Sequence, residues 1–207
     1  MTLDFSAARE NMVENQVRTN DVTDLAIQDA MRAVRRETVC PANRLHLAYA
    51  EAEVEYAPGL HLLQPRDLAK LLQGVRPCTG ERALAIAAPY GALVLAAMGL
   101  SVRLRLPEGV ETAVAAPVEV THAALDAAEA GAVYDVILVE GAVTSTPDAW
   151  TAMLAPGGRL GVIERRGPVG HGTLYLRGDD GVISHRPLFD AQPAYLPGFA
   201  PVAAFQF

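Results

Sequence analysis

One stretch of the chain, residues 134–163, constrains the fold more than any other. An unbroken apolar run at Tyr134–Val139 is followed by a segment of helical character through Trp150 and by a second apolar run at Leu160–Ile163. Strands without polar alternation are typical of a parallel sheet that is covered on both faces. Between the runs, the Pro156–Gly158 turn cannot continue a helix and allows a tight reversal. The stretch therefore predicts two neighbouring strands of a doubly wound α/β sheet.

The rest of the chain predicts the other elements of such a domain. Helical spacing predicts two helices within residues 4–39, with a break and an N-cap at residues 20–24, and alternation predicts a short strand at residues 53–58. Core strands are expected at residues 83–88, 102–106 and 118–120, and helices at 64–72, 91–98 and 122–130. The tail predicts an antiparallel edge, with strands at residues 173–177, 182–187 and 203–207. We expect one domain, 1–207, with N-terminal helices and an arm in 1–75 and a Rossmann-like core in 76–207.

Composition excludes several classes of protein. The 207 residues, 51% of them hydrophobic, suffice for one domain with its own core. Cys40 and Cys78 are too few for a disulfide framework, and neither they nor the scattered histidines have the spacing of a metal site. No apolar run approaches the ~20 residues of a membrane span. We therefore expect a cytoplasmic protein without a metal and without a membrane segment.

Charge argues against nucleic acid as a partner. The chain has 24 acidic and 17 basic residues, and its net charge of -7 repels phosphate backbones. The dense basic clusters, at residues 32–36 and 165–166, are expected on solvated faces or at loop ends. The sequence also lacks the motifs of serine hydrolases, P-loop nucleotide triphosphatases and zinc proteases. An oligomeric state cannot be inferred from these features.

Several motifs in a fixed order carry a resemblance to a known family. They lie at residues 11–18, 29–41, 48–51, 59–65, 134–160 and 196–199. Residues 29–41 read DAMRAVRRETVCP, residues 59–65 read GLHLLQP, and residues 154–160 read LAPGGRL. This order resembles the protein-L-isoaspartate O-methyltransferases, in a bacterial branch. The resemblance implies a class I methyltransferase fold, S-adenosylmethionine as the cofactor, and isoaspartyl carboxylates of a protein or peptide as the substrate.

The loop that would bind the cofactor departs from that family. The resembled enzymes carry a D-x-G-x-G-x-G loop after the first core strand, and its glycines let the backbone approach the ligand. The matching positions here read Ala85-Ile86-Ala87-Ala88-Pro89-Tyr90-Gly91. Ala85 lacks the carboxylate, Ala87 adds a methyl group, Pro89 removes an N–H, and only Gly91 is retained. We expect Ala85, Ala87 and Gly91 to mark the cofactor position, with binding strongly weakened.

The next strand lacks the family's acid as well. In the resembled enzymes that strand ends in a carboxylate for the ribose hydroxyls, whereas here it ends Leu104-Arg105-Leu106-Pro107. Glu108 is the nearest acid and the remaining candidate for this contact. The segment at residues 107–116 is also too short for a full crossover helix, which takes about a dozen residues with its turns. We therefore expect one wall of the cofactor cleft to be trimmed.

The candidate substrate-binding residues are His61 and Gln64, and the candidate catalytic residue is Glu140. His61, Leu62 and Leu63 stand where the resembled family has a T-I-S element, and leucine offers no hydrogen bond. His61 is either a donor to a carboxylate or a histidine that lies on a surface arm or packs in the core, and Gln64 equally suits the start of a helix. Glu140, at the expected end of its strand, is either a catalytic general base or a residue that caps a helix or braces a loop.

Two functions of different classes remain open. The first is a non-catalytic relative that serves as a binding or assembly module and has lost or strongly weakened cofactor binding. The second is an active S-adenosylmethionine-dependent methyltransferase for isoaspartyl carboxylates in damaged proteins. The altered residues favour the first, and the motif order along the chain favours the second.

Overall fold

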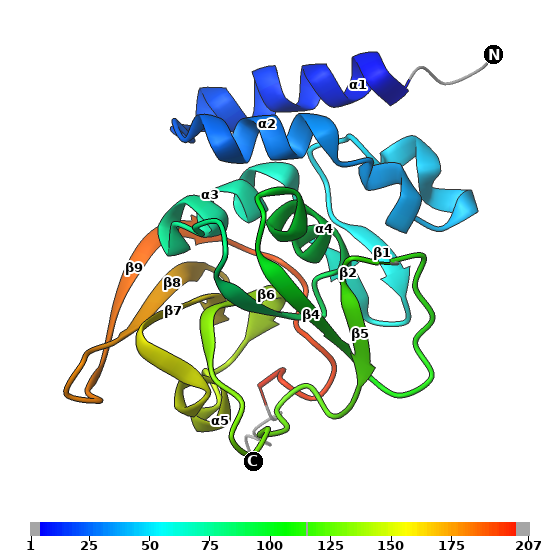
Figure 1. The fold of residues 1–207 in the computed structure, drawn as a ribbon. Helices are drawn as coiled ribbons and strands as arrows, with labels where there is room; N and C mark the ends of the chain where they lie inside the picture. The colour runs from blue at the N-terminus through cyan, green and yellow to red at the C-terminus, as the bar shows by residue number, and fades with distance from the viewer. Residues whose placement is uncertain (1–4, 115, 202–207) are drawn as a thin grey trace.

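The computed structural model describes residues 5–114 and 116–201, and it contains a seven-stranded, mostly parallel sheet (Figure 1). The order of the strands across the sheet is β5-β4-β3-β6-β7-β8-β9. Their bounds are β3 Arg82–Ile86, β4 Ser101–Leu106, β5 Glu119–His122, β6 Tyr134–Val143, β7 Leu154–Arg165, β8 Gly170–Arg177 and β9 Ile183–Ala191. The first five are parallel, and β8 and β9 continue the sheet in antiparallel pairing. The predicted fold class is confirmed; the expected strand at 203–207 lies outside the described residues.

The core strands have unbroken apolar runs because both faces of the sheet are buried. Along β3, Ala83 and Ala85 belong to one hydrophobic cluster, whereas Leu84 and Ile86 belong to the other. These four side chains are all fully buried. Successive side chains of a strand point to opposite faces, so each face contributes its own half of the core.

Helices cover one face. α3 Pro65–Val75 and α4 Pro89–Ala97 pack against the strands, α2 Leu25–Ala33 packs on α3 and α4, and α1 Phe5–Met12 lies above α2 in Figure 1. Residues 13–20 continue α1 as a π-helical turn and a 3₁₀ turn. The predicted N-cap of the second helix is confirmed, since Asp24 Oδ1 accepts from Ala26 N at 2.9 Å. None of the helices within residues 5–114 and 116–201 is long and apolar enough to cross a membrane.

A short arm joins α2 to α3. It contains 3₁₀ turns at Arg36–Val39 and Ala42–Leu47 and an antiparallel pair, β1 Val54–Ala57 and β2 Leu60–Leu62. The structure confirms the predicted short strand and adds its partner. As expected, Pro65 occupies the first turn of α3, where its missing N–H costs nothing.

The other face is covered mainly by irregular chain, and the helix expected at residues 122–130 is wrong. Arg105 projects from β4 toward this segment and donates to the carbonyl oxygens of Leu125, at 3.4 Å, and Ala127, at 2.6 Å. Trp150 Nε1 also donates to Leu125 O at 2.8 Å. Because these carbonyls accept from side chains of the core, tertiary contacts override the helix propensity of the alanines.

The helix expected directly after Glu140 is wrong too. β6 continues through Val143, since Ala142 and Val143 pair with Ile163 and Glu164 of β7 after an irregularity at residues 138–142. Gly141 has φ +135°, which only glycine adopts without strain. A single short helix, α5 Asp148–Ala152, follows. Glu140 therefore lies inside a strand rather than at its end.

Candidate functional site

The cofactor position of the resembled family corresponds to the junction between β3 and α4, and here that junction has little exposure to solvent. Every residue at 85–91 is buried, and Ala87 and Ala88 are fully so. Ala87 has φ +50°, the left-handed conformation in which a glycine would be unstrained. The backbone thus keeps the shape that a glycine loop would have, while methyl groups occupy the space beside it.

A side chain of the arm covers this junction. Tyr56 of β1 donates its hydroxyl to the carbonyl oxygen of Ala87 at 3.1 Å, and burial raises the pKa of that hydroxyl above its usual value. Tyr56 and Val110 each pack against both hydrophobic clusters. His122 Nε2 lies 3.0 Å from Val110 O and so ties the segment after β4 to the end of β5. The Tyr56 side chain therefore lies against the loop at residue 87.

Gly91, the one retained glycine, is needed because a carboxylate lies against it. A Cβ atom there would be 2.7 Å from Leu138 Cδ2 and 3.0 Å from Glu140 Oε1. The Gly91 N–H donates to Glu140 Oε1 at 2.8 Å. Since Gly91 is in the first turn of α4, this N–H is one that the helix itself leaves unpaired. An acidic side chain of the protein therefore occupies the anion position of this helix.

Glu140 is fully buried, and both of its carboxylate oxygens accept hydrogen bonds. The second bond comes from Leu63 N, at 2.9 Å, where β2 leads into α3. Burial raises the pKa of Glu140 above its usual value, against the opposing effect of the nearby Arg36. The geometry thus gives Glu140 a bracing contact to two segments of backbone.

Arg36 is the charge partner of this site, and the expectation that its cluster is solvated is wrong for this residue. Its side chain is 0% exposed, and it donates to Ala48 O at 2.8 Å and Leu63 O at 2.7 Å. Its guanidinium lies 4.8 Å from the centre of the Tyr90 ring. Arg36 Nη1 and the Tyr90 hydroxyl have no hydrogen-bond partner among the described residues. A buried cation next to Glu140 compensates the charge of the carboxylate.

The two candidate substrate-binding residues flank Leu62 and Leu63 in the sequence, and Leu63 is the residue that donates to Glu140. His61 is half-buried in β2, opposite Glu55, and its Nδ1 is buried without a hydrogen-bond partner within the described part of the chain. Gln64 precedes α3; its carbonyl accepts from Leu68 N, but its side chain makes no capping bond. Leu62 and Leu63 are fully buried. The element that would offer hydroxyls in the resembled family is therefore apolar packing here.

Glu108 lies apart from this arrangement. It is exposed in a turn after β4, and its side chain forms no hydrogen bond or ion pair with any residue that the structure describes. We expected one wall of the cofactor cleft to be trimmed, and the element order agrees, because no helix separates β4 from β5 within the described residues.

His, Cys, Asp and Glu side chains form no group that could hold a metal ion in the described part of the chain.

Comparisons with known proteins find relatives over most of the chain. The protein-L-isoaspartate O-methyltransferase of Methylorubrum populi is 34% identical over 179 residues, which cover 81% of this chain and 84% of that protein. The enzyme of the same name from Methylorubrum extorquens is 34% identical over 182 residues, covering 83% and 79%. The chain belongs to the protein-L-isoaspartate O-methyltransferase family. No protein-family model matches it.

Solved structures support the fold of this family. A protein-L-isoaspartate O-methyltransferase of Plasmodium falciparum, in complex with S-adenosyl-L-homocysteine, superposes with a TM-score of 0.74 at 16% identity, covering 91% of this chain and 97% of that one. A second protein-L-isoaspartate O-methyltransferase superposes with a TM-score of 0.69 at 20% identity, covering 92% and 66%. The shared fold is that of a class I methyltransferase.

S-adenosylmethionine is the cofactor that family membership implies, and the residues present in this member do not fit it. The bracing carboxylate is replaced by the buried methyl group of Ala85, and β4 ends in the buried Leu106. The carbonyl of Ala87 and the N–H of Gly91 are engaged by Tyr56 and Glu140. No chemical step through the cofactor can be derived from this arrangement.

Sequence reasoning missed Tyr56 and Arg36. The alternation of Val54 and Tyr56 could have indicated that Tyr56 faces the domain, because residues two apart on a strand share a face. For Arg36 no signal was available, since it sits in a run of basic residues that is otherwise typical of a solvated surface.

Proposed function

We propose that this member of the protein-L-isoaspartate O-methyltransferase family is a non-catalytic binding or assembly module, in which S-adenosylmethionine binding is lost or strongly weakened. One observation carries the proposal: the groups that would meet the ligand at the β3–α4 junction are already bonded within the protein, to Tyr56 and Glu140. The ligand would have to displace both of these buried contacts in order to bind.

The size of the effect supports the same conclusion. The carboxylate at position 85, the backbone approach at Ala87 and the N–H at Pro89 are three contacts that this chain does not offer. At about 1 to 1.5 kcal/mol for each lost contact, affinity falls by roughly two to three powers of ten. A site of micromolar affinity would thus become a millimolar one.

An active methyltransferase is the second candidate, and a specific observation favours it. The relatives that match over four fifths of the chain carry the name of the enzyme. A protein or peptide with an isoaspartyl carboxylate would then be the substrate, with S-adenosylmethionine as the methyl donor. In that case His61 and Gln64 lie at and beside the positions of the family's substrate element, and Glu140 accepts a hydrogen bond from Leu63 N of that element.

Isothermal titration separates the two candidates. S-adenosylhomocysteine is titrated into the whole chain and, in parallel, into the Methylorubrum populi relative, which controls for ligand quality and conditions. The proposal predicts no binding heat for this chain below millimolar ligand. Micromolar binding, or methyl ester formation on an isoaspartyl peptide, would establish the second candidate and overturn the first.

A further inference from the structure

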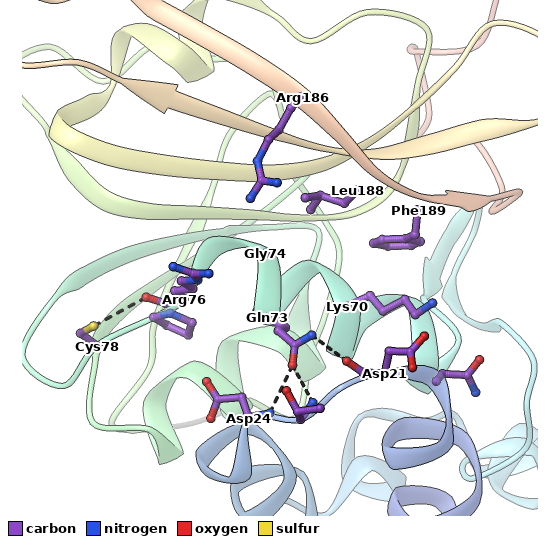
Figure 2. Close-up of a pocket in the computed structure, with 13 residues that line it drawn as sticks. Asp21, Asp24, Lys70, Gln73, Gly74, Arg76, Cys78, Arg186, Leu188 and Phe189 are labelled. Carbon is purple, nitrogen blue, oxygen red and sulfur yellow. Dashed lines mark hydrogen bonds between the residues drawn. The ribbon is translucent and has the colours of Figure 1, made fainter.

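A solvent-open groove of about 660 Å³ lies between α3, β9 and the loop that precedes α2 (Figure 2). Residues 76–78, which lead into β3, also line it, so the groove lies toward the amino end of that strand. It is therefore separate from the junction at which β3 leads into α4. Gly74 allows the two walls to approach, since a Cβ there would be 2.4 Å from Leu188 Cδ1.

The basic side chains of this groove lack anionic partners. Of the 17 basic residues in the chain, only Lys70, Arg76 and Arg186 donate no side-chain hydrogen bond and form no ion pair within residues 5–114 and 116–201, and all three line the groove. Every other basic side chain either donates a hydrogen bond to an oxygen atom or, as with Arg44 and Arg82, lies in an ion pair with a carboxylate. Lys70 makes one ring contact, with its Nζ 5.6 Å from the centre of the Phe189 ring.

The remaining polar groups of the groove are mostly in use. The Gln73 amide accepts from Thr23 N at 2.7 Å and from Asp24 N at 3.2 Å, and it donates to Asp21 O at 2.8 Å. Asp24 also caps α2. These bonds fix the loop wall against α3, as Figure 2 shows. The Asp21 carboxylate forms no hydrogen bond or ion pair within the described residues, so the unused donors of the groove are mainly its three cations.

We propose that this groove binds an acidic segment of a partner protein. Its cations lie on separate walls, Lys70 on α3 and Arg186 on β9, with the apolar side chains of Leu188 and Phe189 in the same lining. An open groove of this kind suits an extended chain with alternating acidic and apolar side chains better than a small anion, which favours an enclosed site. The net charge of -7 opposes such a partner only weakly, because the screening length is about 8 Å at physiological salt.

The inference goes beyond the proposed function, since it assigns a second site and the chemistry of its partner. The two are tested separately. Cofactor titration reports on the β3–α4 junction, whereas peptide binding reports on the groove. Either proposal can therefore be overturned while the other stands.

Fluorescence anisotropy with a short fluorescein-labelled peptide of alternating glutamate and leucine tests the groove directly, using the whole chain. We expect saturable binding that weakens with added salt, and each of Lys70→Gln and Arg186→Gln should weaken it about two- to fivefold. Arg44→Gln is the matched control, because Arg44 is an exposed arginine outside the groove. No saturable binding, or equal weakening by Arg44→Gln, would overturn the proposal.

Zero-length cross-linking locates the bound peptide, because Lys70 is the only lysine in the chain. A carbodiimide activates a peptide carboxylate, the Lys70 amine displaces the activating group as a urea, and an amide bond forms. The adduct should map to Lys70, and Lys70→Arg should abolish it while anisotropy still reports binding. An adduct confined to the amino terminus, or peptide binding no tighter than that of inorganic phosphate in competition, would contradict a peptide site.

Discussion

At the scale of single residues, Glu140 explains how this member of the family keeps its fold around an altered site. Its carboxylate joins the start of α4, through Gly91 N, to the end of β2, through Leu63 N. Arg36 offsets part of the cost of burying that charge, although burial still raises the pKa of Glu140. An anion supplied by the protein thus satisfies a helix terminus that would otherwise need a ligand or water.

Glu140→Gln should destabilise the protein, because the new amide nitrogen would face one of the two N–H donors and leave it unsatisfied. We expect the free energy of unfolding to fall by about 2 kcal/mol, the cost of one buried unsatisfied donor. Urea denaturation followed by tryptophan fluorescence measures this fall. Glu108→Gln is the control, since Glu108 is exposed and without partners in the described chain, and it should change stability by less than about 0.5 kcal/mol. Unchanged stability in Glu140→Gln would mean that the carboxylate does not act as a brace.

The sequence revealed the altered loop but not what replaces its contacts. The exchange of glycine for Ala87 and Pro89 could be read directly from the motif, because backbone requirements are local. Arg36 and Tyr56 reach the same place from a segment about thirty to fifty residues earlier, and such contacts depend on tertiary structure. Local patterns therefore predicted what the site lacks and left open what fills it.

At the scale of elements, the irregular segment between β5 and β6 shows why the predicted helix is absent. The alternation of Arg103 and Arg105 on β4 directs both side chains to the face without long helices, where they meet Glu129. Tyr134 at the start of β6 donates to the same carboxylate at 2.8 Å. The alanines of this segment indicate its helix propensity. Its role as hydrogen-bond acceptor for Arg103 and Arg105 could not be predicted, because it depends on the register of the sheet. The parallel strands were easier to predict, because two-sided burial leaves an unbroken apolar run.

The pH dependence of stability should carry the signature of Glu129. Burial alone would raise the pKa of this carboxyl, but hydrogen bonds from Arg105 and Tyr134 outweigh burial, and the net pKa is below the usual 4.5. A carboxyl with a lowered pKa contributes stability above pH 4.5 and loses it as the pH falls through its folded-state pKa. Glu129→Gln should therefore lower the urea midpoint at pH 7. Between pH 5 and pH 3 the midpoint of this variant should fall less than that of the unaltered protein.

A matched control distinguishes this effect from general acid sensitivity. Glu111 is exposed in the segment after β4, so in Glu111→Gln the urea midpoint should fall between pH 5 and pH 3 as it does in the unaltered protein. If the urea midpoint fell equally between pH 5 and pH 3 in the Glu129→Gln variant and in the unaltered protein, the arginines would not stabilise the ionised carboxylate. Proteins that unfold in two states give such midpoints directly.

At the scale of the whole molecule, the N-terminal helices and the sheet share one hydrophobic cluster. Met12 and Ile27 from the extension belong to the same buried set as Leu104 and Leu138 of the sheet. The division into residues 1–75 and 76–207 is therefore a division in sequence, and buried apolar contacts cross it. Shared burial of this kind couples the unfolding of the two parts.

Cooperative unfolding should follow, and two spectroscopic probes can test it because they report on different parts. Trp150 is the only tryptophan and is fully buried in the 76–207 part, whereas α1, α2 and α3 in the 1–75 part contribute strongly to the circular dichroism at 222 nm. The two urea transitions should coincide. Met31→Ala, which truncates a fully buried side chain of α2, should lower the free energy of unfolding by about 2 to 5 kcal/mol. Both urea midpoints should fall together. If that variant moved the dichroism transition and left Trp150 unaffected, the extension would be a separate folding unit, and contacts such as the one between Tyr56 and Ala87 would not couple it to the core.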